Sequence, residues 1–184
     1  DWSSDVCSSD LRKMKRSISL LVLTLAVISF AVGTISAQNG TSFSDPSVDY
    51  TFELPDAKWK MTVKPSAANP NVEFVYVDRL DGHLEVRKQA VSRNTLMSDV
   101  IKDEEQKLQF RPGFVAGKEE NFVGKLNGSI FNYEFVRAGR PMSGRVYFLR
   151  SGDSVYILRF TGFTDKLRSI RHQTDSIART FAVR

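Results

Sequence analysis

Five arginines in the second half of the chain are the residues best suited to chemistry. They are Arg137, Arg140, Arg145, Arg150 and Arg159, with no lysine among them. A guanidinium is planar and can donate two parallel hydrogen bonds to one carboxylate or phosphate group. The set therefore predicts a patch that binds a small anion or an acidic partner. The alternative is that these arginines protect strand edges and keep the surface soluble.

Other kinds of site have weaker support. The only histidines are His83 and His172. His83 beside Asp81 or Asp78 would make an exposed metal site, but we expect it to be a solvated hairpin residue. His172 and Asp175 could share a helix face, but two ligands make a poor metal site, and we expect His172 to lie on the surface. The sequence has no G-x-S-x-G motif for a serine nucleophile and no phosphate loop ending in Lys-Ser or Lys-Thr. We expect no metal, no cofactor and no catalytic residue.

The start of the chain contributes little to these predictions. Residues 1–11 resemble one translated reading frame of a sequencing adapter, so residues 1–13 are interpreted as an artefact upstream of Met14. Cys7 is the only cysteine of the 184 residues and lies within this stretch. The remainder therefore has no thiol for disulfides, zinc-thiolate sites or nucleophilic catalysis. The net charge of +5 is too small to indicate nucleic acid as a partner.

Residues 14–37 have the layout of a secretory signal peptide. Lys15 and Arg16 precede a mostly apolar stretch, and small residues lead to a cleavage site between Ala37 and Gln38. This predicts a periplasmic or secreted protein. The alternative is an uncleaved anchor, since the stretch is long enough to span a bilayer. No cysteine follows it, which excludes a lipoprotein anchor.

The arginines must be positioned by elements that the hydrophobic pattern predicts. Residues 38–48 are polar and indicate a flexible leader, and residues 49–184 form a single domain. Period-two alternation predicts strands, and an Asp81-Gly82 turn joins strand 72–80 to strand 83–91. Apolar residues spaced three or four apart predict a helix over 96–110 and a last helix from Thr164 or Asp165. Ser98 or Asn94 could cap the first of these helices. The predicted strands are 50–54, 59–63, 72–80, 83–91, 115–123, 129–137, 145–150 and 154–160, with a turn over 139–144. This order favours an α+β fold with a mostly antiparallel sheet of about six to eight strands.

The segment Tyr50-Thr51-Phe52-Glu53-Leu54-Pro55-Asp56-Ala57-Lys58-Trp59 supplies a family resemblance. It resembles the opening of the PsbP/Mog/DcrB-like superfamily, whose members often begin Tyr-x-Phe-x-x-Pro followed by Trp. The order of elements and the Thr180-Phe181 pair near the end are also similar. The resemblance implies an α/β/α sandwich with a middle helix and a C-terminal helix, and a largely non-enzymatic role. It transfers no functional residue, because the shared positions are turn and core residues.

Taken together, these features favour an exported, non-catalytic domain that binds an envelope protein or an anionic ligand. We expect a monomer that contacts a membrane only through an uncleaved signal. The alternative function is a small cofactor-free hydrolase or isomerase using Asp, Glu and Arg in a cleft on the sheet. Such an enzyme would show carboxylates converging in a deep pocket, whereas a binding domain would show an exposed apolar or arginine-rich face.

The signal peptide gives the first prediction. When the chain is expressed with its signal, we expect the exported form to begin at Gln38, because signal peptidase cleaves after small residues such as Ala37. N-terminal sequencing of the extracytoplasmic fraction measures this. A protein that keeps residues 14–37 and stays with the membrane would instead be anchored.

Overall fold

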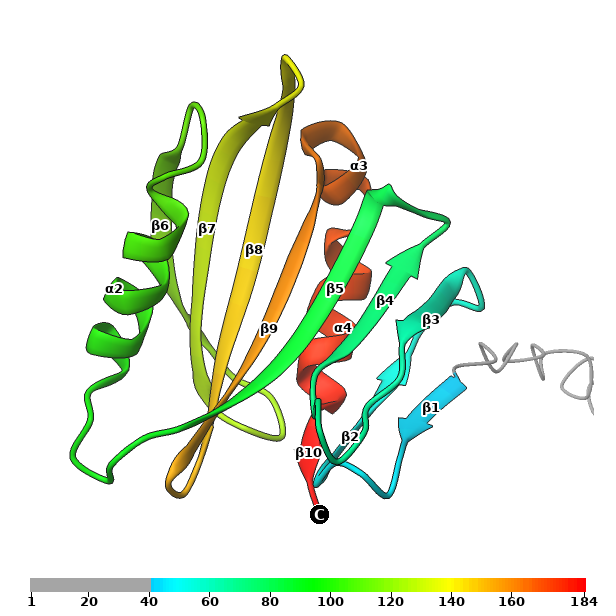
Figure 1. The fold of residues 1–184 in the computed structure, drawn as a ribbon, viewed down its shortest axis with the longest axis vertical. Coiled ribbons are helices and arrows are strands. Elements are labelled where there is room, and N and C mark those ends of the chain that lie inside the picture. Colours follow the sequence, from blue (N-terminus) through cyan, green and yellow to red (C-terminus); the bar gives the residue numbers. More distant parts are fainter. Residues whose placement is uncertain (1–40) are drawn as a thin grey trace, which may run out of the picture. The chain divides into compact units, whose positions relative to one another are not determined.

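The computed structural model describes residues 41–184, which contain an antiparallel sheet of seven strands (Figure 1). The strand order is β3-β4-β5-β9-β8-β7-β6. The β8–β9 hairpin lies in the middle, where β9 pairs with β5 and β8 pairs with β7. The strands are β3 (Trp59–Val63), β4 (Val72–Tyr76), β5 (Asp78–Ala90), β6 (Val115–Phe122), β7 (Gly128–Arg137), β8 (Arg140–Ser151) and β9 (Ser154–Phe163).

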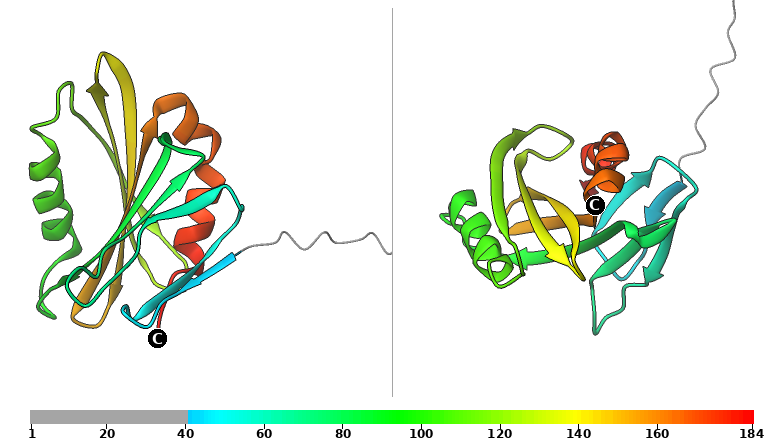
Figure 2. Two further views of the ribbon diagram at one scale, coloured as in Figure 1. Left: turned by 45° about the vertical axis from the view of Figure 1, so that its right-hand side comes forward. Right: turned by 90° about the horizontal axis from the view of Figure 1, so that it is seen from above.

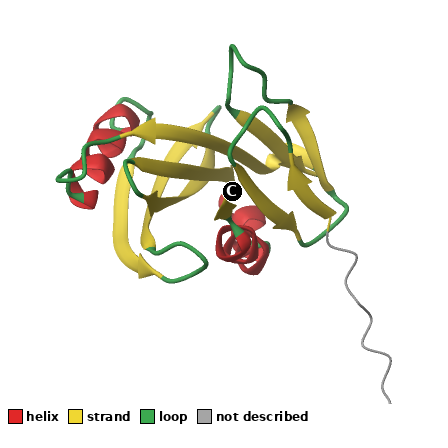
Figure 3. Cartoon of the chain, turned by 90° about the horizontal axis from the view of Figure 1, so that it is seen from below, coloured by secondary structure: helices red, strands yellow, loops and turns green. Residues whose placement is uncertain are grey.

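Helices cover both faces of this sheet (Figures 2 and 3). The middle helix α2 (Met97–Leu108) packs on one face, and α3 (Thr164–Ser169) and α4 (Arg171–Thr180) pack on the other. A second sheet of order β1-β2-β10 lies on the α4 side, formed by β1 (Thr41–Ser44), β2 (Tyr50–Leu54) and β10 (Ala182–Val183). The predicted α+β class, antiparallel sheet, middle helix and C-terminal helices are confirmed.

Two hydrophobic clusters fill the two faces, and the alternation of strand side chains divides them. Along β9, Val155 and Ile157 belong to the cluster under α2, while Tyr156 and Leu158 belong to the cluster under α4. All four side chains are buried. Central strands covered on both faces therefore have apolar residues at consecutive positions, and a polar residue there needs a partner inside the protein.

Phe181, just after α4, joins the second sheet to the main one. Its side chain is fully buried and stacks on Tyr50 with ring centroids 5.1 Å apart, and on Phe52 at 6.1 Å. On the main sheet it contacts Tyr156 at 5.2 Å. These rings hold the small sheet and the chain's C-terminal segment against the main sheet.

The predicted flexible leader is wrong over its described part. Residues 41–44 form β1, and Phe43 is buried against Phe52 at 4.8 Å and Phe74 at 5.6 Å. Val48 is also buried. One aromatic residue anchors a segment whose other residues are small and polar, which is why composition alone indicated a leader. Residues 38–40, the predicted signal peptide and the adapter-like residues lie outside the described part.

The Asp81-Gly82 turn is also wrong, because both residues lie inside β5. The β4–β5 turn is at Val77, with φ of 62°. The Asp78 carboxylate accepts hydrogen bonds from the backbone N–H groups of Leu80 and Asp81. A Cβ at position 82 would come within 2.9 Å of the Ile170 side chain, so Gly82 serves close packing against the start of α4.

Three smaller differences concern turns and helix ends. The β7–β8 turn is Ala138-Gly139, with φ of 50° and 74°, so β8 begins at Arg140 and the predicted 139–144 turn is mostly strand. The last helix is interrupted at Ile170, which divides α3 from α4. Leu96 precedes α2 without a side-chain cap, so neither Ser98 nor Asn94 caps it.

No helix within residues 41–184 is long and apolar enough to cross a membrane. The same residues contain no group of three or more His, Cys, Asp or Glu side chains that could hold a metal ion.

Two phenylalanines allow a matched test of the core. We expect Phe181→Ala to lower the free energy of unfolding by about 3–5 kcal/mol, because it empties the junction between the two sheets. Phe110→Ala removes a side chain that is 91% exposed and should change the same quantity by less than about 0.5 kcal/mol. Urea unfolding followed by circular dichroism measures both, and equal losses would contradict the assigned core.

Candidate functional site

The five arginines predicted to form one patch are distributed over four regions. Arg145 points to the α4 face, where it contacts Asp175, whereas Arg159 points to the α2 face, where it contacts Glu104. Arg137 and Arg140 lie at the β7–β8 turn. The single patch is therefore wrong, because side chains on adjacent strands follow the register of the sheet and not their order in the sequence.

Arg150 has a structural role. Its Nη1 donates to the carbonyl of Thr95 at 2.6 Å, and its Nη2 donates to the carbonyls of Ser92 at 3.0 Å and Arg93 at 2.9 Å. These bonds hold the loop before α2 against the end of β8. The donors of Arg150 used in this way are not available to a ligand.

Arg159 belongs to a buried ion network under α2. Its guanidinium pairs with Glu85 of β5, and its Nη1 lies 3.4 Å from Oε1 of Glu104. The same Glu104 oxygen accepts from Nη2 of Arg87 at 2.7 Å. Two carboxylates and two guanidiniums thus meet between the helix and the sheet, with Glu104 only 1% exposed.

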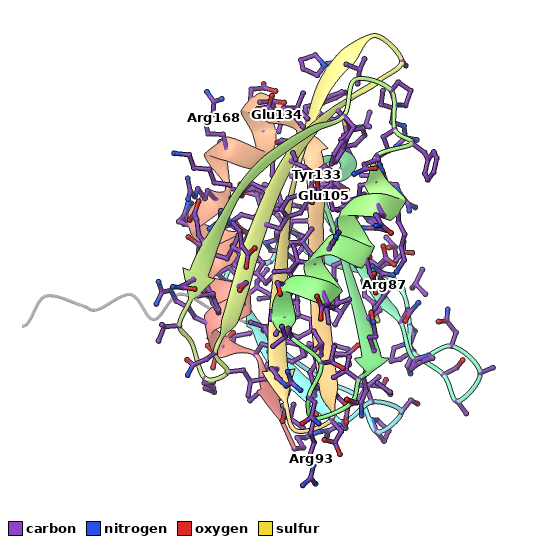
Figure 4. The ribbon with its side chains drawn as sticks, turned by 90° about the vertical axis from the view of Figure 1, so that its left-hand side faces the viewer. Arg87, Arg93, Glu105, Tyr133, Glu134 and Arg168 are labelled. Carbon is purple, nitrogen blue, oxygen red and sulfur yellow. The ribbon has the colours of Figure 1, made fainter. Side chains whose placement is uncertain are left out.

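This network contains the converging carboxylates that the alternative enzyme function requires, but it lacks a cleft. Each carboxylate faces an arginine, and Glu104 is buried on the side of α2 that faces the sheet. Tyr133 lies behind the same helix (Figure 4), and burial raises the pKa of its hydroxyl. The hydroxyl of Tyr133 and Oε2 of Glu104 have no hydrogen-bond partner among residues 41–184. Both atoms are buried.

Arg145 is fixed on the opposite face, where it is 6% exposed. Its Nε donates to Tyr147 Oη at 2.7 Å, its Nη1 to Asn132 at 2.8 Å and its Nη2 to Asp175 of α4 at 3.0 Å. Burial opposes its charge, but Tyr147 and Asp175 together raise the pKa of Arg145 above its ordinary value. Burial also raises the pKa of Tyr147, so this hydroxyl stays protonated and donates to Asp175.

A pocket of about 290 Å³ opens beside Arg145, between the sheet and the C-terminal helices. Arg168 of α3 and Arg171 of α4 line it. Nη2 of Arg171 also lies 3.8 Å from Oε2 of Glu120. Figure 4 shows Arg168 and Glu134 near the same end of the sheet. The pocket is lined by Val115, Gly117, Asn132, Tyr133, Glu134, Ser143, Gly144, Arg145, Thr164, Leu167, Arg168 and Arg171.

The pocket offers donors without internal partners. The buried hydroxyl of Thr164 has no hydrogen-bond partner among residues 41–184. A guanidinium has five N–H donors, and the hydrogen bonds of Arg145 to described residues leave one donor free on each Nη atom. The lining includes no His or Cys, and Glu134 is its one carboxylate. The pocket therefore places cationic and neutral hydrogen-bond donors beside apolar walls.

Sequence reasoning found one residue of this pocket and missed the others. Arg145 was in the predicted patch, whereas Arg168, Ser143 and Thr164 were not. Their positions at the start of the last helix and on a predicted turn carried no motif. The signal that could have found Arg168 is its place on the exposed side of an amphipathic helix, next to the end of a strand.

The two histidines differ in outcome. His172 is exposed on α4, as expected. His83 is not exposed: it is 7% accessible, and its Nε2 lies 2.9 Å from Oε2 of Glu73 on the neighbouring strand. The expectation failed because it depended on the Asp81-Gly82 turn. With that turn inside β5, His83 becomes a strand residue paired across the sheet.

Comparison with known proteins identifies the fold. Neither a protein-family profile nor a curated protein sequence matches the chain. Among solved structures, cyanobacterial PsbP (CyanoP) from Synechocystis superposes with a TM-score of 0.56 at 15% identity, covering 84% of this chain and 98% of its own. Yeast Ran-binding protein Mog1p superposes with a TM-score of 0.58 at 9% sequence identity, and the match covers 80% of this chain and 96% of Mog1p. LpqN of Mycobacterium tuberculosis, which is involved in cell envelope biogenesis, superposes with a TM-score of 0.53 at 13% sequence identity. This match covers 79% of this chain and 91% of LpqN. The chain has the PsbP/Mog1-like fold, and none of these three neighbours is named as an enzyme.

The buried network under α2 gives a prediction about stability. Glu104→Gln removes the charge that faces Arg87 and Arg159 while nearly keeping the shape of the side chain. We expect it to lower the free energy of unfolding by about 3 kcal/mol, because Arg87 and Arg159 are then left to share the single carboxylate of Glu85.

The matched control is Asp103→Asn, which removes a carboxylate from the exposed side of the same helix turn. It should change the free energy of unfolding by less than about 0.5 kcal/mol. Denaturant unfolding of the two variants measures the difference, and similar values for both would show that the network contributes no stability.

Proposed function

We propose that this chain is an exported, non-catalytic binding domain of the cell envelope that holds an anionic group of a ligand in the pocket beside Arg145. The observation that carries this proposal is the state of Arg145. Asp175, Tyr147 and Asn132 hold its guanidinium in place, yet two of its N–H donors have no acceptor among the described residues. A fixed donor loses little conformational freedom when it binds.

The neighbourhood of Arg145 supports an anionic ligand with an apolar body. The unpartnered hydroxyl of Thr164 and the side chain of Ser143 add neutral hydrogen-bonding groups. Arg168 adds a cation that forms no ion pair with residues 41–184. Val115 and Leu167 supply apolar wall. Ligand pockets commonly combine a few polar groups with apolar surface in this way.

A non-catalytic role fits the chemistry of the pocket better than the alternative hydrolase or isomerase. General acid–base catalysis needs a donor and an acceptor of protons within reach of one substrate. The pocket's one carboxylate, Glu134, is exposed, and the carboxylates that do converge, Glu85 and Glu104, are enclosed with arginines on the other face.

The envelope location is proposed from the signal-like residues 14–37. The role of LpqN in envelope biogenesis and the Ran binding of Mog1p support the view that this fold serves binding proteins in different compartments. No partner of those proteins is carried over, because the likeness is one of fold at low identity.

Hexanoate tests the pocket, because it joins a carboxylate to a short apolar chain. We expect it to shift backbone amide NMR signals of residues around Ser143 and Thr164, while hexanol, which lacks the charge, shifts them at least fivefold less at equal concentration. Arg168→Gln should weaken hexanoate binding at least threefold, since it removes an exposed cation at the rim.

Arg93→Gln is the matched control, because Arg93 is 85% exposed and lies at the opposite end of the molecule (Figure 4). It should leave hexanoate binding unchanged. Equal binding of hexanoate and hexanol, or equal effects of the two variants, would show that the pocket does not recognise an anionic group.

A further inference from the structure

The loop after α2 and the β7–β8 turn meet at one end of the sheet. The backbone N–H of Val136 donates to the carbonyl of Pro112 at 2.7 Å, which attaches this loop to the last residues of β7. The β7–β8 hairpin projects beyond the neighbouring strands at this end (Figure 1). The name arginine tip is used here for Phe110, Arg111, Val136, Arg137 and Arg140.

The arginine tip carries positive charge without nearby sequence neighbours of opposite charge. No Asp or Glu occurs between residues 106 and 118 or between residues 135 and 152. Within residues 41–184, Arg111, Arg137 and Arg140 form no ion pair, whereas Arg87, Arg145 and Arg159 all do. The tip therefore keeps its full charge on the protein surface.

Arg137 and Arg140 also oppose each other as the last residue pair of the hairpin. Like charges directly opposite on neighbouring strands destabilise a hairpin. A cation–π contact offsets part of this cost, because the Arg140 guanidinium lies 3.6 Å from the Phe163 ring centroid. The Arg111 guanidinium makes a similar contact, 4.7 Å from the Phe135 ring centroid. A bound anionic surface would remove the remaining repulsion.

Phe110 adds an apolar side chain beside these charges. It is 91% exposed, the largest value among the exposed hydrophobic residues of 41–184, and Val136 is 38% exposed. Its position directly before Arg111 places an aromatic ring and a guanidinium on one loop. Aromatic and basic residues side by side are typical of segments that bind at the interface between water and an anionic bilayer.

We propose that the arginine tip binds the surface of an anionic lipid bilayer, with Phe110 entering the headgroup region. The tip projects from the sheet, and none of its arginines lines the pocket beside Arg145. A projection without a pocket fits an extended anionic surface better than a small soluble anion. This surface is independent of the pocket and lies beyond the proposed ligand binding. Each basic residue close to an anionic membrane strengthens binding about fivefold, and salt screens the effect over about 8–10 Å.

Vesicle sedimentation tests the proposal with the 184-residue protein. We expect binding to vesicles of one part phosphatidylglycerol and two parts phosphatidylcholine to exceed binding to pure phosphatidylcholine at least tenfold. It should fall when the salt concentration rises from about 0.05 M to about 0.3 M. Arg137→Gln combined with Arg140→Gln should weaken binding about twentyfold, and Phe110→Ser at least threefold.

The matched control combines Lys125→Gln with Arg93→Gln, which removes the same charge from exposed positions at the opposite end of the sheet. All variants carry the same N-terminal segment, so its contribution cancels. Circular dichroism melting of each variant should match the parent, since the substituted side chains are exposed.

Three outcomes would overturn the proposal. The first is equal binding to charged and neutral vesicles, and the second is an equal loss in the tip and control variants. The third is binding of soluble glycerol phosphate or of an acidic protein by the tip without binding to vesicles, which would assign this surface to a different partner.

Discussion

Burial of the central hairpin on both faces is the constraint from which the other features of this domain follow. β8 and β9 have α2 on one side and α4 with the small sheet on the other, so consecutive residues of both strands face a hydrophobic cluster. A charged residue at such a position loses its hydration and needs a partner supplied by the protein. Arg145 meets Asp175 of α4, and Arg159 meets Glu85 and Glu104. The two ion clusters consequently attach the covering helices to the sheet at defined positions.

The same constraint explains how much of the fold the sequence predicts. Consecutive apolar residues and short connections identify β7, β8 and β9, and amphipathic spacing identifies α2, because these signals are local. The place of Asp81-Gly82 inside a strand could not be predicted locally, because Gly82 packs closely against Ile170, a residue far away in sequence. The small sheet was missed for a similar reason, since β1 is fixed by Phe43 alone among small polar residues.

The candidate site was less accessible to sequence reasoning than the fold. Whether two arginines share a face depends on strand register, and here Arg145 is opposite Phe160 while Arg159 is opposite Val146. This register directs Arg145 and Arg159 to different faces of the sheet. The pocket beside Arg145 is formed by side chains from β6, β7, β8, α3 and α4. These residues come together only when the helices fold back onto the sheet, so no sequence motif connects them.

The arginines therefore separate by their partners rather than by their number or spacing. Arg145 and Arg159 on the central strands face carboxylates, and their charge stabilises the contact between helix and sheet. Arg145 keeps two N–H donors without an acceptor among residues 41–184. Those at the end of the sheet, Arg137, Arg140 and Arg168, have no carboxylate partner among residues 41–184 and keep their charge exposed. Selection for stability alone would not favour unpaired like charges opposite each other on a hairpin. The unmatched charges are therefore the first places to seek binding, at the arginine tip and at Arg168 beside Arg145, because they gain the most free energy when an anion arrives.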